Sequence, residues 1–223
     1  MNHTSEGQSS QRAPTLALCG LVGALLLGVL PISSWLVHGD SIGRLLAREA
    51  IAWCFALAVL LWLVFAERLP LSSIGFCRPT WKSIAFGVLA AVLSIAILVV
   101  ESVIIIPLLH LDASSMLAGQ RAIMSTPYWY RILLVLRAAV VEEILYRGYL
   151  IEKVRQLSGS TVLAVIVSVA AFTFAHLRGW GPVHLIAVAG GGIVFALFYV
   201  WRRDLPSNML GHFLADAAGF LTR

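Results

Sequence analysis

The sequence is short of charge. Only 12% of its 223 residues are Asp, Glu, Lys or Arg, whereas 60% are hydrophobic and the mean hydropathy is +0.90. A soluble domain of this length cannot bury so much apolar surface, because too many of its residues lie at the boundary with water. The composition therefore excludes an ordinary soluble protein and predicts that lipid surrounds most of the chain.

Cysteine is also scarce, and its pattern excludes two further classes. Cys19, Cys54 and Cys77 form no CxxC spacing, and the odd number argues against a disulfide framework. The net charge of +5 is not arranged as a basic stripe with interleaved aromatic residues, so we expect no nucleic-acid partner. These cations instead fit loops that face anionic lipid headgroups.

Long apolar runs make up most of the chain. About twenty apolar residues suffice to cross a bilayer as a helix, and by this measure there are seven candidate spans. They cover residues 15–37, 46–66, 83–107, 129–150, 161–177, 183–201 and 205–221. The sequence thus predicts an all-α polytopic membrane protein with about seven transmembrane helices. We expect a disordered polar tail over residues 1–13 and a single transmembrane domain over residues 14–223.

Loop cations predict the orientation. If the N-terminus is cytoplasmic, eight Lys and Arg residues fall on the cytoplasmic side and six on the opposite side. This excess favours a cytoplasmic N-terminus. The first apolar run is not followed by a small-residue cleavage pattern, so we interpret it as a retained span rather than a signal peptide.

The fourth apolar run, VVEEILYRGYL, contains three ionisable residues: Glu142, Glu143 and Arg147. A charged group within a bilayer is costly unless it pairs or lines a wet cavity, so it marks a candidate functional site. Glu143 and Arg147 are four residues apart, with the glutamate first, which favours an ion pair on a helix. The side chain of Glu142 points about 100° away from that of Glu143 around the helix axis. We therefore expect a structural pair and, in Glu142, a desolvated carboxylate without an ion-pair partner that can serve as general base.

Two later spans each carry a histidine. His176 follows Phe172 by four residues in FTFAH, and HFLAD places His212 and Asp216 on one helix face. Histidines and carboxylates from three helices can bind a divalent metal such as zinc and leave a position for water. The same groups can instead activate water without a metal, with Glu142 and His176 as base and partner and His212 beside an oxyanion. The spacing leaves both alternatives open.

Structural roles compete with these assignments. Glu101 and Arg137 are expected near the non-cytoplasmic ends of consecutive spans, where they can neutralise each other. The glycine run at residues 190–192 fits close helix packing. Structural roles alone do not readily explain why EExxxR, FxxxH and HxxxD occur in this order on successive spans.

In their order and spacing, these three patterns resemble the CPBP family of intramembrane endopeptidases, also called the Abi family, which includes CAAX proteases and bacteriocin-processing enzymes. The matching segments are EEILYR, FTFAH and HFLAD, within a motif-bearing core at residues 129–221. The resemblance implies a membrane protease, in a bacterial inner membrane, that hydrolyses peptide bonds of peptides or membrane-associated proteins near or within the bilayer.

The resemblance also implies residue roles. Glu142 and His176 would activate the water, and His212 with the residue at position 216 would hold the oxyanion. The prenyl endopeptidases of the family carry asparagine at that last position, whereas this chain has Asp216. An ionised carboxylate cannot donate a hydrogen bond, so Asp216 must be protonated, orient His212 or bind a metal. If a metal such as zinc is present, its expected ligands are His176, His212, Asp216 and Glu142; otherwise no cofactor is expected.

Two other functions remain open at this point: a catalytically inactive membrane scaffold or immunity protein that binds a partner, and an ion or proton translocator. The broken helices in two related halves that are typical of translocators are missing. The protease hypothesis has a geometric difficulty of its own. At about 1.5 Å per residue, His176 lies about 24 Å and His212 about 10 Å from the cytoplasmic side. Straight helices would keep them apart, so the hypothesis requires tilt, a displaced loop or a shifted helix boundary.

Overall fold

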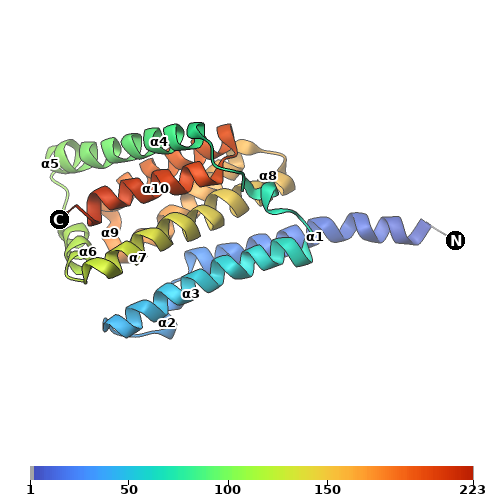
Figure 1. Cartoon of the computed structure of the whole chain (residues 1–223), viewed down its shortest axis with the longest axis horizontal. Helices are drawn as coiled ribbons and strands as arrows, with labels where there is room; N and C mark the ends of the chain where they lie inside the picture. The colour runs from blue at the N-terminus through green and yellow to red at the C-terminus, as the bar shows by residue number, and fades with distance from the viewer. Residues whose placement is uncertain (1–2, 223) are drawn as a thin grey trace.

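The computed structural model describes residues 3–222, with side chains from Pro14 onward, and over these residues the secondary structure is helical (Figure 1). The all-α prediction is therefore confirmed. The expected disordered tail, residues 1–13, lies outside the described side chains and stays a prediction. The elements are α1 (His3–Val29), α2 (Ile32–Leu36), α3 (Ile42–Leu61), η1 (Trp62–Ala66), η2 (Leu71–Ile74), α4 (Trp81–Val100), η3 (Glu101–Ile105), α5 (Ile106–Leu108), α6 (Ser114–Met124), α7 (Tyr128–Arg137), η4 (Ala138–Ile151), α8 (Glu152–Ser158), α9 (Thr161–Arg202) and α10 (Leu205–Phe220).

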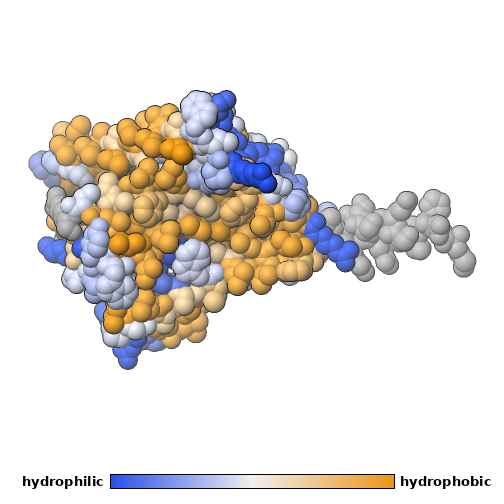
Figure 2. Space-filling view, viewed as in Figure 1, coloured by the Kyte–Doolittle hydropathy of each residue, from blue (hydrophilic) through white to orange (hydrophobic). Residues whose placement is uncertain are grey.

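Three segments of the described chain are long and apolar enough to cross a membrane: Ile42–Ala66, Trp81–Leu108 and Thr161–Arg202. Large apolar side chains cover much of their outer surface, as Figure 2 shows in orange. Phe65 and Trp81, for example, are 74% and 73% exposed. Water would not tolerate so continuous an apolar surface, whereas lipid does. The chain is a multi-pass integral membrane protein.

The segment labelled α9 is two antiparallel halves rather than one straight helix. Gly181 has φ +75° and ψ 172°, a conformation that only glycine adopts readily, and Pro182 follows it. A Cβ placed on Gly192 would lie 3.2 Å from the ring of Phe172, twenty residues earlier in the chain. In a straight helix those residues would be about 30 Å apart. The two halves correspond to the spans predicted at residues 161–177 and 183–201.

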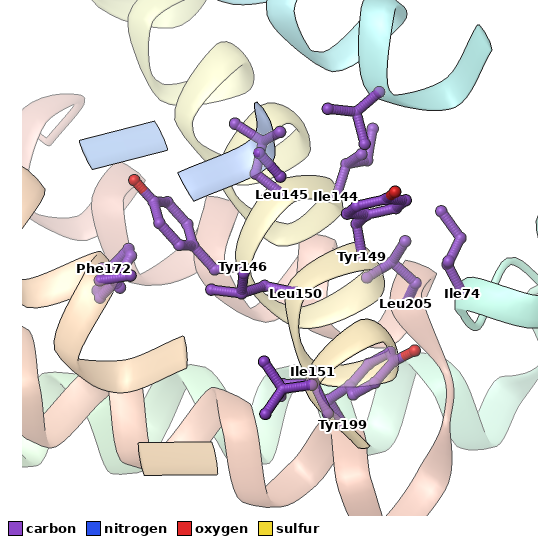
Figure 3. Close-up of a cluster of buried hydrophobic side chains, with 14 of the residues drawn as sticks. Ile74, Ile144, Leu145, Tyr146, Tyr149, Leu150, Ile151, Phe172, Tyr199 and Leu205 are labelled. Atoms are coloured by element: carbon purple, nitrogen blue, oxygen red, sulfur yellow. The ribbon is translucent and has the colours of Figure 1, made fainter. Parts of the chain in front are cut away.

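The centre of the bundle is η4, which packs against α1, α3, α9 and α10. Figure 3 shows its apolar side chains, among them Tyr149 and Ile151, packed against Ile74, Tyr199 and Leu205 from other elements. Tyr149, Ile151, Tyr199 and Leu205 are completely buried. Because the helix that carries the EExxxR motif is enclosed on all sides, its polar side chains must find partners inside the protein.

Helices α4 and α10 approach closely through two glycines. A Cβ on Gly211 would lie 2.7 Å from the carbonyl oxygen of Gly87, and a Cβ on Gly87 would lie 2.8 Å from that of Ser207. Neither neighbour is a flexible side chain that can move aside. Small residues at such crossings allow helices in lipid to pack backbone against backbone.

We expect Gly211→Ala to destabilise the protein by about 1–3 kcal/mol, because the added methyl group must push α10 away from α4. Thermal unfolding in detergent or nanodiscs measures the effect. Gly219→Ala is the matched control on the same helix, because a Cβ there meets nothing within 4 Å. Alanine should raise stability there by about 0.5–1 kcal/mol through helix propensity. Equal melting temperatures for the two variants would contradict the close crossing.

Candidate active site

A buried ion pair holds the site together. Arg147 Nη1 donates to Glu143 Oε1 at 2.8 Å, and both side chains are 0% exposed. The guanidinium also lies over the ring of Phe172, 4.2 Å from its centroid, and Nη2 is 3.4 Å from the carbonyl oxygen of Gly192. The ion pair expected from the i,i+4 spacing is present. Arg147 additionally joins η4 to both halves of α9.

Glu143 has a second set of partners on α10. Its Oε1 accepts from His212 Nδ1 at 2.9 Å, and its Oε2 accepts from Asn208 Nδ2 at 3.1 Å. Asn208 also donates to the carbonyl oxygen of Phe195 at 2.7 Å. Asn208 lies one helical turn before His212, which was the only sequence signal for this role. Glu143 therefore fixes the orientation of the His212 ring as well as pairing with Arg147.

The expectation that Glu142 lacks an ion-pair partner was wrong. Arg137 Nη1 donates to Glu142 Oε1 at 2.8 Å, and Arg137 Nε donates to Glu49 Oε2 at 2.7 Å. The physical reason is the π-helical winding that begins at Ala138, since π turns bring residues five apart onto one face. Arg137 and Glu142 are five apart, a relation that α-helical spacing does not reveal.

The expected pairing of Glu101 with Arg137 was also wrong. Glu101, completely buried in η3, accepts from the backbone N–H of Ala187 at 3.1 Å and lies 3.5 Å from His184 Nδ1. Both of these partners belong to the second half of α9. Arg137 contacts Glu49 and Glu142 instead.

The free oxygen of Glu142 faces two imidazoles. Its Oε2 lies 3.8 Å from His176 Nε2 and 4.0 Å from His212 Nε2. This oxygen is buried and has no hydrogen-bond partner within the described protein. His212 Nε2 is also 3.6 Å from Asp216 Oδ2. The predicted site residues thus converge on one point, and the separations are too long for direct hydrogen bonds but suit one intervening water.

The hydrogen bonds on the far side of each ring indicate which nitrogen carries a proton. His176 Nδ1 is 2.8 Å from the carbonyl oxygen of Phe172. A carbonyl oxygen only accepts, so Nδ1 must donate, and Nε2 of the neutral ring is left with its lone pair toward Glu142. His212 Nδ1 donates likewise to the Glu143 carboxylate. Its Nε2 can therefore donate toward the site only when the ring is an imidazolium, a state that the surrounding carboxylates stabilise.

Two phenylalanines hold these rings in place. The ring of Phe172 is close to both histidines, with its centroid 4.6 Å from that of His176 and 6.2 Å from that of His212. Phe195 stacks on His212 at 5.3 Å, with an angle of 22° between the planes. Phe172 was predicted from the FxxxH pattern. Phe195 was missed, because an apolar residue in an apolar helix carries no distinguishing signal.

The expected difference in depth between His176 and His212 is explained by where the neighbouring helices begin and end. The helix that carries Glu142 continues through α8 to Ser158, beyond the predicted end at residue 150. Tyr199 and Arg203, at the end of α9, contact Glu152 rather than the end of α8. The connection from α9 to α10 is therefore set well into the bundle, and α10 starts deeper than a straight arrangement predicts.

The converging groups line a cavity of about 310 Å³. Glu142, His176, His212 and Asp216 are at its wall, together with residues of α4 and α6 that include Ile95, Leu98, Met116 and Gln120. Its volume is within the usual range for small-molecule sites. The rest of the wall combines apolar side chains with further polar residues that include Ser94, Ser102 and His184.

Metal binding was the alternative that the sequence left open. Among the residues that the structure describes, three or more His, Cys, Asp or Glu side chains are nowhere grouped to hold a metal ion. Of the predicted ligands, His176 and His212 have their Nε2 atoms 3.8 and 4.0 Å from Glu142 Oε2, and Asp216 Oδ2 lies 3.6 Å from His212 Nε2.

Comparison with protein families places these motifs in a known context. Residues 124–218 match the family described as "Type II CAAX prenyl endopeptidase Rce1-like". The match runs from the end of α6 to α10 and contains all three motifs. Comparisons with curated proteins and with solved structures gave no match. Residues 124–218 form an Rce1-like type II CAAX prenyl endopeptidase (CPBP) family domain, which indicates that the chain is a protease.

Proposed function

We propose that this protein is an intramembrane endopeptidase in which Glu142 and His176 activate a water molecule for attack on a peptide bond. The observation that carries the proposal is the free Oε2 of Glu142, which faces the Nε2 atoms of His176 and His212 at 3.8 and 4.0 Å. The match of residues 124–218 to a protease family favours this function over an inactive scaffold or an ion translocator.

The first step is deprotonation of water. A water oxygen can lie within hydrogen-bond distance of both Glu142 Oε2 and His176 Nε2, because these atoms are 3.8 Å apart. Each atom is an acceptor, so each accepts a hydrogen bond from one O–H of the water, and a lone pair of the water oxygen is directed at the scissile carbonyl. Glu142 takes the proton as the new C–O bond forms.

The second step is collapse of the tetrahedral intermediate. His212, as an imidazolium held by Glu143, donates from Nε2 to the oxyanion. The C–N bond then breaks, and the proton on Glu142 passes to the leaving nitrogen. The carboxylate is regenerated, and the products are a carboxylic acid and an amine. Neither step consumes a co-reactant other than water.

Asp216 is best explained as a partner of the His212 cation, 3.6 Å from Nε2. The negative charge of Asp216 is not required to stabilise that cation, because Glu142 and Glu143 also face the His212 ring. We expect Asp216→Asn to keep at least the wild-type kcat, because the amide removes a negative charge near the oxyanion and adds a donor. Asp216→Ala should lower kcat about tenfold or more, because the polar group that orients His212 Nε2 is then gone. Equal losses in both variants would show that the carboxylate itself is required.

The test of the proposed function is peptide cleavage by the purified protein in lipid nanodiscs. Prenylated and unprenylated peptide libraries are incubated with the protein, with and without a chelator, and the products are identified by mass spectrometry. We expect cleavage at defined sites that Glu142→Gln abolishes and that the chelator leaves intact. Cleavage lost on chelation would refute the metal-free steps, and absence of cleavage in both libraries would refute the function.

A further inference from the structure

A series of hydrogen bonds leads from Tyr130 on α7 to Glu142 on η4. Tyr130 Oη donates to Glu49 Oε1 at 2.9 Å. Arg137 Nε donates to Glu49 Oε2 at 2.7 Å, and its Nη1 donates to Glu142 Oε1 at 2.8 Å. Glu49 belongs to α3, which lies outside the segment that matches the family. No motif in the sequence pointed to it.

The side chains in this series of hydrogen bonds are mostly shielded from solvent. The exposed fractions of the side chains are 11% for Glu49, 19% for Arg137 and 13% for Glu142. Ion pairs with so little exposure are screened only weakly, so their geometry matters more than that of surface pairs. One guanidinium is shared between two carboxylates, and each carboxylate determines where it points.

Arg137 also separates two cavities. It lines the site cavity and a second cavity of about 540 Å³, whose wall contains Glu49 and Tyr130. Ile123 and Leu134 are common to both walls. Glu49 therefore acts from outside the space in which substrate is expected to bind.

We propose that Glu49 is a positioning residue that acts on Glu142 through Arg137. By holding Nε, Glu49 directs only Nη1 at Glu142, so that Oε1 is occupied and Oε2 stays free toward the imidazoles. Without Glu49, the guanidinium has one carboxylate left and can engage both of its oxygens, as arginine prefers. Both oxygens of Glu142, the proposed general base, would then be occupied by Arg137. This inference rests on the proposed function.

The test is a double-mutant cycle in kcat with Glu49→Gln and Arg137→Gln. Glu49→Gln should lower kcat about 10- to 100-fold, a loss typical of a misplaced catalytic group. KM should change by less than about twofold, because Glu49 does not line the substrate cavity. In the Arg137→Gln background, Glu49→Gln should have no further effect, because the intermediary is gone.

Further variants separate positioning from folding. Glu49→Asp keeps the charge and should recover part of the kcat lost in Glu49→Gln. Tyr130→Phe removes only the hydroxyl and should lower kcat about 3- to 10-fold. Asp40→Asn is the matched control, an acid-to-amide change on the wall of the same second cavity but outside the chain of hydrogen bonds. Its side chain is 89% exposed, and its kcat should equal that of the wild type.

The outcomes distinguish this inference from the proposed function. A wild type that cleaves and a Glu49→Gln variant with unchanged kcat would refute the positioning role alone. Multiplicative losses in the double mutant would refute the route through Arg137. A rise in KM at constant kcat would identify Glu49 as a binding residue instead. A wild type without cleavage would overturn the function and the inference together.

Discussion

Glu142→Gln is expected to lower kcat by about 10²–10⁴-fold while the protein stays folded. Glutamine has nearly the same shape and can still accept from Arg137 through its amide oxygen. It cannot take a proton from water, so the loss measures general-base catalysis rather than packing. Steady-state cleavage of a peptide found in the library experiment provides kcat, and size-exclusion chromatography with thermal unfolding checks the fold.

Glu152→Gln is the matched control for that substitution. The Glu152 side chain is equally exposed, at 13%, and pairs with Arg203 at 3.1 Å, but it does not line the site cavity. We expect it to lose at most a little stability and to keep its cleavage activity. If Glu142→Gln retained kcat within a fewfold of the wild type, Glu142 would not be the base.

Arg147→Met is expected to destabilise the protein by about 3–5 kcal/mol, the usual cost of removing one partner from a buried ion pair. The pair is 0% exposed on both sides, so Glu143 would lose its arginine in the protein interior and keep only His212 and Asn208 as partners. Methionine also loses the contacts of the guanidinium with Phe172 and Gly192. Chemical or thermal unfolding of the protein in nanodiscs measures the difference.

Two further variants make the Arg147 result interpretable. Arg178→Met changes an exposed arginine on α9 and should alter stability by less than about 0.5 kcal/mol. Glu143→Gln combined with Arg147→Met removes the buried charge and should recover part of the stability. Activity should not return, because His212 then lacks its carboxylate partner. A loss below about 1 kcal/mol in Arg147→Met would mean that the pair does not organise the bundle.

The sequence predicted the architecture where spacing translates directly into geometry. Apolar length located the three long segments that can cross a membrane, and the i,i+4 relation identified the pair of Glu143 with Arg147. The same relation placed His212 and Asp216 on one face. These predictions concern positions along one helix, so they needed no knowledge of how the helices pack.

Contacts between helices and departures from α-helical winding were not predictable in this way. The π-helical turns of η4 bring Arg137 to Glu142, and nothing in the local composition signals them. Glu49 on α3 reaches Arg137 only through tertiary packing. The extension of the central helix to Ser158 was hidden because residues 151–158 are more polar than a membrane span.

The most direct measurement is an experimental structure of the protein in lipid at a resolution that shows ordered water. We expect a single water within about 2.7–3.2 Å of both Glu142 Oε2 and His176 Nε2, with Arg137 on the other oxygen of that carboxylate. A dry site, a histidine turned away from Glu142, or anomalous scattering from a metal at this position would contradict the account.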